Sequence, residues 1–238
     1  MRQVAKGNTP NCLQAFIDAQ LAIKPEPVNL TYRDFPYKSA LCETLTREQY
    51  GLCGYTGAPV DERITQLQPA VAGPSFRNHI EHLKCQQACR DEVTGRDEEY
   101  GRVVGDDLNY RNMIAALEVR GAEVEHFGAV AKAARTLPVL PTHEDCEERF
   151  VFREGDGSVD GLGDTARTSI SVLALNHDTL KGWRLSALST WLDPLIVQTR
   201  EDFMDVLQAV TTPNNERLPE YAFVIESVAK GYINENDL

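Results

Sequence analysis

The sequence predicts an α+β protein that is mostly helical. Apolar residues recur at helical spacing over much of the 238 residues, whereas two short stretches, His79–His82 and Arg149–Arg153, read as strands. A hydrophobic content of 42% with 25% charged residues is typical of a globular protein, and the length is sufficient for a core.

The N-terminal part is predicted to be helical. An apolar stripe over residues 10–23, with Pro10 in the first turn, predicts one helix, and residues 39–50 predict a second helix that stops at Gly51. The prolines within residues 24–27 end the first helix and predict a stiff, extended connector. Residues 52–57 predict a short strand and turn.

The middle of the chain alternates predicted loops with short elements. Residues 61–76 predict a polar loop that leads into the strand at 79–82. Leu108, Met113 and Leu117 stand at helical spacing and predict a helix. The predicted elements after the strand are a helix over 84–92, a charged loop over 94–107, a helix over 108–120 and a short helix over 128–135.

The C-terminal part predicts a hairpin followed by helices. Residues 149–153 alternate like a strand, and Gly155 to Gly157 turn the chain toward a second strand at 158–159. Helices are predicted over 164–175, 177–191, 199–211 and 219–231. The organisation is therefore a helical segment at 1–50, a segment at 51–135 that carries the candidate site, and a hairpin plus helical region at 136–238.

Composition limits the functional classes. No apolar run reaches the roughly 18 to 20 residues of a membrane helix, and the first residues lack the apolar core of an export signal. The six cysteines are sparse, which predicts reduced thiols and a cytoplasmic protein. The net charge of −12 has the wrong sign for a protein that holds a polyanion alone. Residues 1–100 carry only −2 of this charge, so nucleic-acid affinity would be local or supplied by a partner.

The candidate site is the run His79-Ile80-Glu81-His82. Alternation along a strand would place His79 and Glu81 on one face and His82 on the other. A carboxylate is a ligand for Mg²⁺, and an imidazole can take a proton from an attacking water near neutral pH. An isolated H-x-x-H is also common as a surface pair or an incidental zinc ligand set, so the pattern by itself leaves both interpretations open.

Several segments, in one order, resemble a known family. The H-I-E-H run lies in the segment Asn78–Lys84, and a Y-x-N pattern at Tyr110–Asn112 lies in the segment Leu108–Met113. The other segments that carry the resemblance are Cys53–Thr56, Leu140–Phe150 and Ala166–Asn176, followed by Arg184. Together they resemble the HNH endonucleases of the PtuB type, which are nuclease subunits of Septu and retron-associated anti-phage defence systems. The resemblance covers about residues 50–190. It implies that 51–135 form a ββα-metal (HNH) nuclease core flanked by N- and C-terminal helices.

The resemblance also implies roles for single residues. His82 would be the general base, Glu81 a metal ligand, and Asn112 a residue that fixes the active-site loop or reaches the metal. His126 is the candidate for the third ligand, and a surface histidine is the alternative. His79, which would share the face of Glu81 on the strand, is counted with the catalytic residues as one that supports Glu81, and a structural role is the alternative. The cofactor would be Mg²⁺ or Mn²⁺, and structural Zn²⁺ is not expected because the sequence contains no Cys-x-x-Cys.

Three functions follow as expectations. The first is a metal-dependent endonuclease, acting on nucleic acid that is expected to be DNA, with an ABC/SMC-like ATPase of the PtuA type as partner and no membrane. The second is an effector of a retron system that cleaves RNA or tRNA. The third is a non-catalytic adaptor with a degenerate HNH core. Four basic residues near the motif could contact phosphates or form a solvated charged face: Arg77, Lys84, Arg90 and Arg111.

Overall fold

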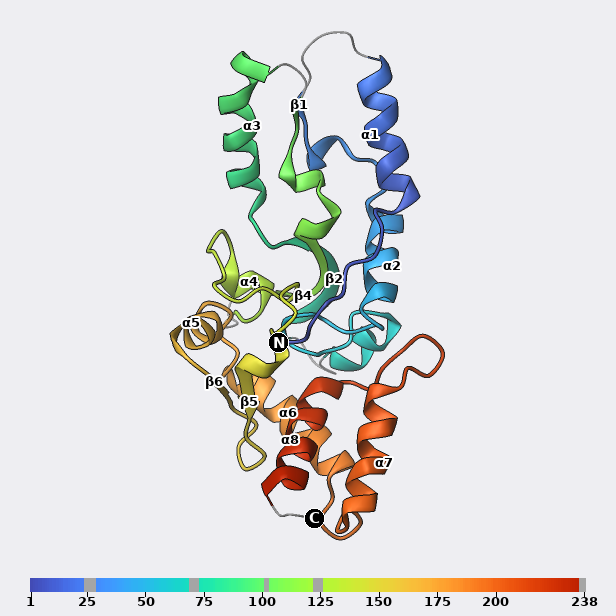
Figure 1. Cartoon of the computed structure of the whole chain (residues 1–238), viewed down its shortest axis with the longest axis vertical. Coiled ribbons are helices and arrows are strands. Elements are labelled where there is room, and N and C mark those ends of the chain that lie inside the picture. The colour runs from blue at the N-terminus through green and yellow to red at the C-terminus, as the bar shows by residue number, and fades with distance from the viewer. Residues whose placement is uncertain (24–28, 69–72, 101–102, 122–125, 236–238) are drawn as a thin grey trace.

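A computed structural model describes residues 1–23, 29–68, 73–100, 103–121 and 126–235 (Figure 1). It confirms the α+β class, with roughly half of the chain helical. The helices are α1 (Asn11–Ile23), α2 (Lys38–Glu48), α3 (Gln86–Tyr100), α4 (Ala129–Lys132), α5 (Asp164–Val172), α6 (Asp178–Trp191), α7 (Arg200–Thr211) and α8 (Ala222–Glu235). The strands are β1 (Asn29–Leu30), β2 (Ser75–His82), β3 (Val103–Val104), β4 (Met113–Arg120), β5 (Phe150–Phe152) and β6 (Val159–Gly161).

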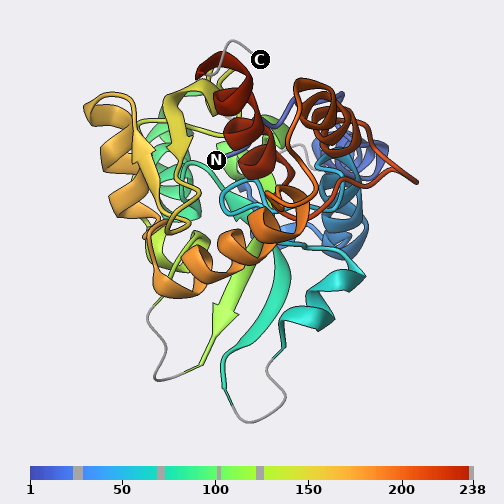
Figure 2. The same ribbon diagram turned by 90° about the horizontal axis from the view of Figure 1, so that it is seen from below.

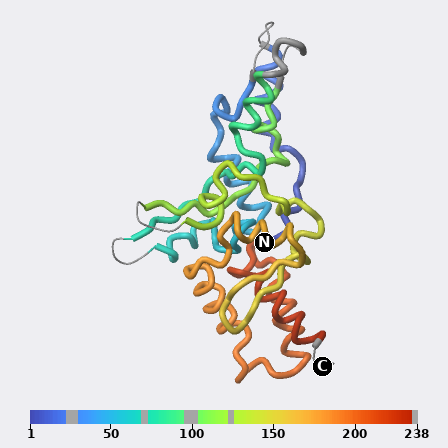
Figure 3. The backbone as a smooth tube through the Cα atoms, turned by 90° about the vertical axis from the view of Figure 1, so that its left-hand side faces the viewer, coloured from blue at the N-terminus to red at the C-terminus, as the bar shows by residue number. Residues whose placement is uncertain are grey.

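The centre of the molecule is an antiparallel ribbon of β2 and β4. Ser75 pairs with Arg120 at one end and His82 with Met113 at the other. The end near Ser75 and Arg120 extends away from the helices, whereas the end that carries His82 lies inside the molecule (Figures 2 and 3). The ribbon thus carries the H-I-E-H run into the protein interior.

The outer edge of β4 is covered by side chains. Gln49 is 3% exposed; its amide nitrogen donates to the Ala115 carbonyl at 2.8 Å, and its amide oxygen accepts from the Ala115 N–H at 2.7 Å. The Leu117 N–H lies 3.3 Å from the sulfur of Cys53. These contacts satisfy polar backbone groups that a neighbouring strand would otherwise have to pair.

The predicted helix over 108–120 is wrong. This segment is a 3₁₀ turn at Tyr110–Asn112 followed by strand β4. The run Met113–Leu117 is apolar at every position and fully buried, and periodicity cannot distinguish such a buried strand from a helix.

Two neighbouring predictions also need correction. Helix α3 continues to Tyr100, so the charged loop predicted over 94–107 begins at least seven residues too early. The polar loop predicted over 61–76 contains a 3₁₀ helix at Glu62–Leu67, capped by Asp61, whose carboxylate accepts from the Arg63 N–H at 3.0 Å. Capping by a local carboxylate is a contact that apolar periodicity does not report.

Helix α4 follows β4 in the chain and packs against it. It has a single turn because residues with positive φ stand at both ends, Gly128 at 63° and Ala133 at 50°. The Gly128 N–H donates to the Leu173 carbonyl at 2.8 Å, which fixes the start of α4 to the end of α5.

The C-terminal half confirms the predicted hairpin and four helices. Strands β5 and β6 pair antiparallel, with Phe152 opposite Val159. The side chain of Asn176 bonds both backbone groups of Val159, and buried Arg184 donates to the carbonyls of Gly157 and Leu175. Helices α7 and α8 pack together at the end of the molecule opposite α1 and α3 (Figure 1). Among the described residues, every helix is too short or too polar to span a bilayer.

Candidate active site

The carboxylate of Glu81 is held by two cation-forming side chains. The Lys132 ammonium lies 2.9 Å from Glu81 Oε1 and 2.9 Å from the His82 carbonyl oxygen, and its side chain is only 1% exposed. His79 Nε2 lies 3.3 Å from Glu81 Oε2, and His79 Nδ1 lies 3.1 Å from the Ala116 carbonyl oxygen. Strand alternation therefore brings His79 and Glu81 together, as the sequence predicts.

Tyr55 lies under this carboxylate, in the core. Burial, together with the negative charge of Glu81, raises the pKa of Tyr55 well above its ordinary value. The phenol is therefore neutral at physiological pH and adds no charge to the cluster of Glu81, His79 and Lys132.

His82 points to the opposite side of the ribbon. Its ring packs edge-on against Tyr32, with centroids 4.7 Å apart, and is 4% exposed. Its Nε2 lies 2.9 Å from the Asp107 carbonyl oxygen, which can only accept, so Nε2 carries the proton. Nδ1 is then the acceptor, and the Gln86 amide donates to it at 3.2 Å. Burial lowers the pKa of His82, so the ring is neutral at neutral pH.

Asn112 clamps the loop that follows His82. Its side-chain oxygen accepts from the Lys84 N–H at 2.7 Å. Its amide nitrogen donates to the carbonyls of Lys84 and Asp106 at 3.1 and 3.0 Å. Of the two roles that the family resemblance implies for Asn112, these contacts fit the fixing of the loop.

The three side chains predicted to hold a metal lie in three different places. Glu81 bonds Lys132 and His79, and Asn112 bonds the backbone of the following loop. His126 is exposed and lines a groove of about 630 Å³ with residues of α5 and the start of α6. Within the described ranges, no three His, Cys, Asp or Glu side chains stand close enough together to hold a metal ion.

Two side chains nevertheless fit a divalent ion. Glu81 and His79 present an oxygen and a nitrogen 3.3 Å apart on one face of β2. Mg²⁺ and ions like it keep most of their water ligands and need one or two protein ligands beside a phosphate. Lys132 places a positive charge on the same carboxylate, which opposes the binding of a further cation at Glu81.

A cleft of about 520 Å³ opens beside Asn112. Its walls come from the loop after His82, the 3₁₀ turn before β4 and the segment after α4. Its charged lining residues are Lys84, Arg111, Arg135 and Asp106. Of the four basic residues singled out in the sequence, two line this cleft. Arg77 instead pairs with Glu118 on the ribbon, and Arg90 donates to Gln87 on α3 at 2.9 Å.

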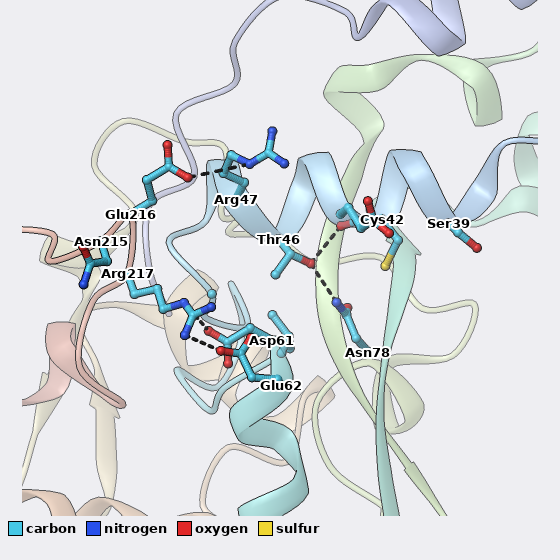
Figure 4. Close-up of a pocket in the computed structure, with 13 residues that line it drawn as sticks. Ser39, Cys42, Thr46, Arg47, Asp61, Glu62, Asn78, Asn215, Glu216 and Arg217 are labelled. Carbon is cyan, nitrogen blue, oxygen red and sulfur yellow. Dashed lines mark hydrogen bonds and ion pairs between the residues drawn. The ribbon is translucent and has the colours of Figure 1, made fainter.

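A second cavity of about 570 Å³ lies between α2, β2 and the turn at 214–217 (Figure 4). The cations that line it are matched by carboxylates: Arg217 pairs with Asp61 and Glu62, and Arg47 lies 3.8 Å from Glu216. This cavity therefore offers less free positive charge to a phosphate than the cleft beside Asn112.

Sequence reasoning assigned no role to Lys132, Asp107 or Arg135. Lys132 was placed on a short helix, but the burial of its ammonium depends on how that helix packs against β4. Asp107 was placed in a loop, and its carbonyl contact with His82 joins residues 25 apart. No local pattern in the sequence encodes either contact.

Comparison with models of protein families, with curated proteins and with solved structures found no match to this chain.

Proposed function

We propose that the chain is a metal-dependent endonuclease of the HNH type. The observation that carries the proposal is the arrangement around His82. The ring is neutral, its Nε2–H is oriented by the Asp107 carbonyl, and the following loop is clamped by Asn112. A neutral imidazole with one nitrogen fixed by a carbonyl has the orientation and protonation state of a general base.

The order of elements supports the same proposal. β2 delivers Glu81 and His82, antiparallel β4 returns beside it, and the short helix α4 packs on β4. A strand pair followed by a helix is the order of a ββα nuclease core, and in this chain α3 and β3 stand between the two strands of the pair. In this proposal α4 contributes Lys132, whose ammonium positions the Glu81 carboxylate.

The metal would be held by Glu81 and His79. A divalent ion supplies polarisation of the phosphate and stabilisation of the leaving oxygen when it is bound. His82 would accept the proton of the attacking water at Nδ1, after Gln86 has given up its hydrogen bond to that atom. Because the His82 ring points to the opposite side of the ribbon from Glu81 and His79, this proposal requires the phosphate to lie past the end of β2, between the base and the metal. The substrate class is nucleic acid, with DNA as the proposed form and RNA as the alternative.

The test is a cleavage assay on single-stranded, double-stranded and RNA substrates. His82→Ala should reduce cleavage by about 10²- to 10⁴-fold, because the water loses its proton acceptor. EDTA should stop the wild-type reaction, and Glu81→Gln should raise the concentration of Mg²⁺ or Mn²⁺ that is needed. His143→Ala, at a half-buried histidine whose Nδ1 accepts from the Leu140 N–H in a turn outside the candidate site, is the matched control and should cleave normally. Cleavage that persists in EDTA, or in His82→Ala, contradicts the proposal.

A non-catalytic adaptor is the second candidate, and a specific observation favours it. Glu81 is already neutralised by the buried ammonium of Lys132, and both ring nitrogens of His82 are hydrogen-bonded. An adaptor with these contacts would show no cleavage on any of the substrates, alone or with its ATPase partner, and Glu81→Gln would leave partner binding unchanged.

A further inference from the structure

The cleft beside Asn112 carries positive charge in an acidic chain. Three cations and one carboxylate line it, whereas the whole chain has a net charge of −12. Such a local excess attracts an anion even where the average field of the protein repels one.

No carboxylate in the described part of the chain pairs with the two arginines of the cleft. Arg111 is exposed, and its guanidinium takes part in no ion pair with the described residues. Arg135 donates to the carbonyls of Ala131 and Val172, which orient the guanidinium but leave its charge in place. Lys84 differs, because it pairs with Glu92 and with Asp106 at 3.1 Å. Arg111 and Arg135 are therefore the groups that can bind a phosphate.

The walls of the cleft are partly aliphatic. Leu83 and Ala88 line one side, and Leu137 and Leu140 line the other. A cavity of about 520 Å³ is within the range that holds a small organic group. An unpaired nucleotide can turn its base and sugar against such walls while its phosphate meets the arginines, whereas the bases of a duplex are stacked and paired.

We propose that this cleft binds one nucleotide unit of an unpaired nucleic-acid strand, with Arg111 and Arg135 at the phosphates. The inference rests on the proposed function, because it places the strand beside the loop that follows His82. Lys84 is two residues from His82, and Lys132, whose ammonium contacts the His82 carbonyl, is three residues from Arg135. A strand in the cleft therefore passes the end of β2 where Glu81 and His82 lie.

The test is a binding titration with a short fluorescent oligonucleotide in EDTA, so that binding is measured without cleavage. The full chain should bind the single strand more tightly than the same strand annealed to its complement. Arg111→Gln should weaken binding and reduce the slope of log K against log salt by about 0.7, the value for one lost phosphate contact with a single strand. Arg111→Lys, which keeps the charge, should retain most of the slope.

Arg200→Gln is the matched control, since it removes the same charge from an exposed site on α7. Arg135→Gln should act like Arg111→Gln, and thermal unfolding will show whether loss of its carbonyl contacts destabilises the chain. The proposal that the cleft binds an unpaired strand would be overturned if Arg111→Gln and Arg200→Gln weakened binding equally, or if the duplex bound more tightly than the single strand. If the chain cleaves nucleic acid but its binding does not depend on Arg111 and Arg135, only the proposal of the strand-binding cleft is overturned. If binding depends on these arginines but no cleavage occurs, only the proposed nuclease function is overturned.

Discussion

At the scale of single residues, the ion pair of Lys132 with Glu81 dominates the candidate site. Both side chains are largely removed from water, so each charge depends on the other. Lys132→Met should lower the free energy of unfolding by about 3 kcal/mol, because it removes the ammonium from a largely buried carboxylate and leaves Glu81 with the His79 contact at 3.3 Å. Urea denaturation measures this loss.

A second variant separates the charge effect from the loss of packing. Lys132→Met combined with Glu81→Gln should be more stable than Lys132→Met alone, since no buried charge remains. Lys230→Met removes an exposed lysine that pairs with Glu226 and should change stability by less than about 1 kcal/mol. If the double variant is no more stable than Lys132→Met, the pair is not the source of the loss.

At the scale of elements, the ribbon of β2 and β4 depends on Gln49. This side chain meets both the N–H and the carbonyl of Ala115 in the interior. Gln49→Leu should destabilise the fold by roughly 2 to 4 kcal/mol, because three buried backbone groups lose their partner: the N–H and carbonyl of Ala115 and the carbonyl of Leu52. Thermal or urea unfolding measures the change.

An exposed glutamine provides the comparison. Gln208→Leu on α7 should change stability by about 0.5 kcal/mol or less. Equal losses in the Gln49 and Gln208 variants would show that the edge of β4 is satisfied in another way.

A comparison of the C-terminal helices with strand β4 shows which elements the sequence could predict and which it could not. The helices after residue 160 were predicted correctly because their apolar residues repeat with one face buried and because Asp164, which suits a helix start, stands at the beginning of α5. β4 was predicted as a helix because it is buried on both faces, and its identity as a strand depends on pairing with β2 and on Gln49. At the site, the shared face of His79 and Glu81 followed from alternation, whereas the Lys132 contact required the tertiary fold.

At the scale of the whole molecule, the charge of −12 opposes long-range attraction of a duplex. The isolated chain should bind duplex DNA weakly at physiological salt and cleave it slowly. The proposed ATPase partner would supply a basic surface, and the acidic C-terminal half is the proposed docking region. Filter-binding titrations of the chain alone and with the partner measure the difference. Tight duplex binding and rapid cleavage by the chain alone would contradict this division of roles.

The junction of α4 and α5 links that docking region to the candidate site. The end of α5 receives the Gly128 N–H at Leu173 and the Arg135 guanidinium at Val172. Residues on both sides of the α4 turn thus donate hydrogen bonds to the C-terminal end of α5. Lys132, within the turn, donates to the Glu81 carboxylate and to the His82 carbonyl. A displacement of α5 would pull the ammonium away from the carboxylate. The C-terminal helices and strand β2 are in this sense mechanically coupled through the buried ammonium of Lys132.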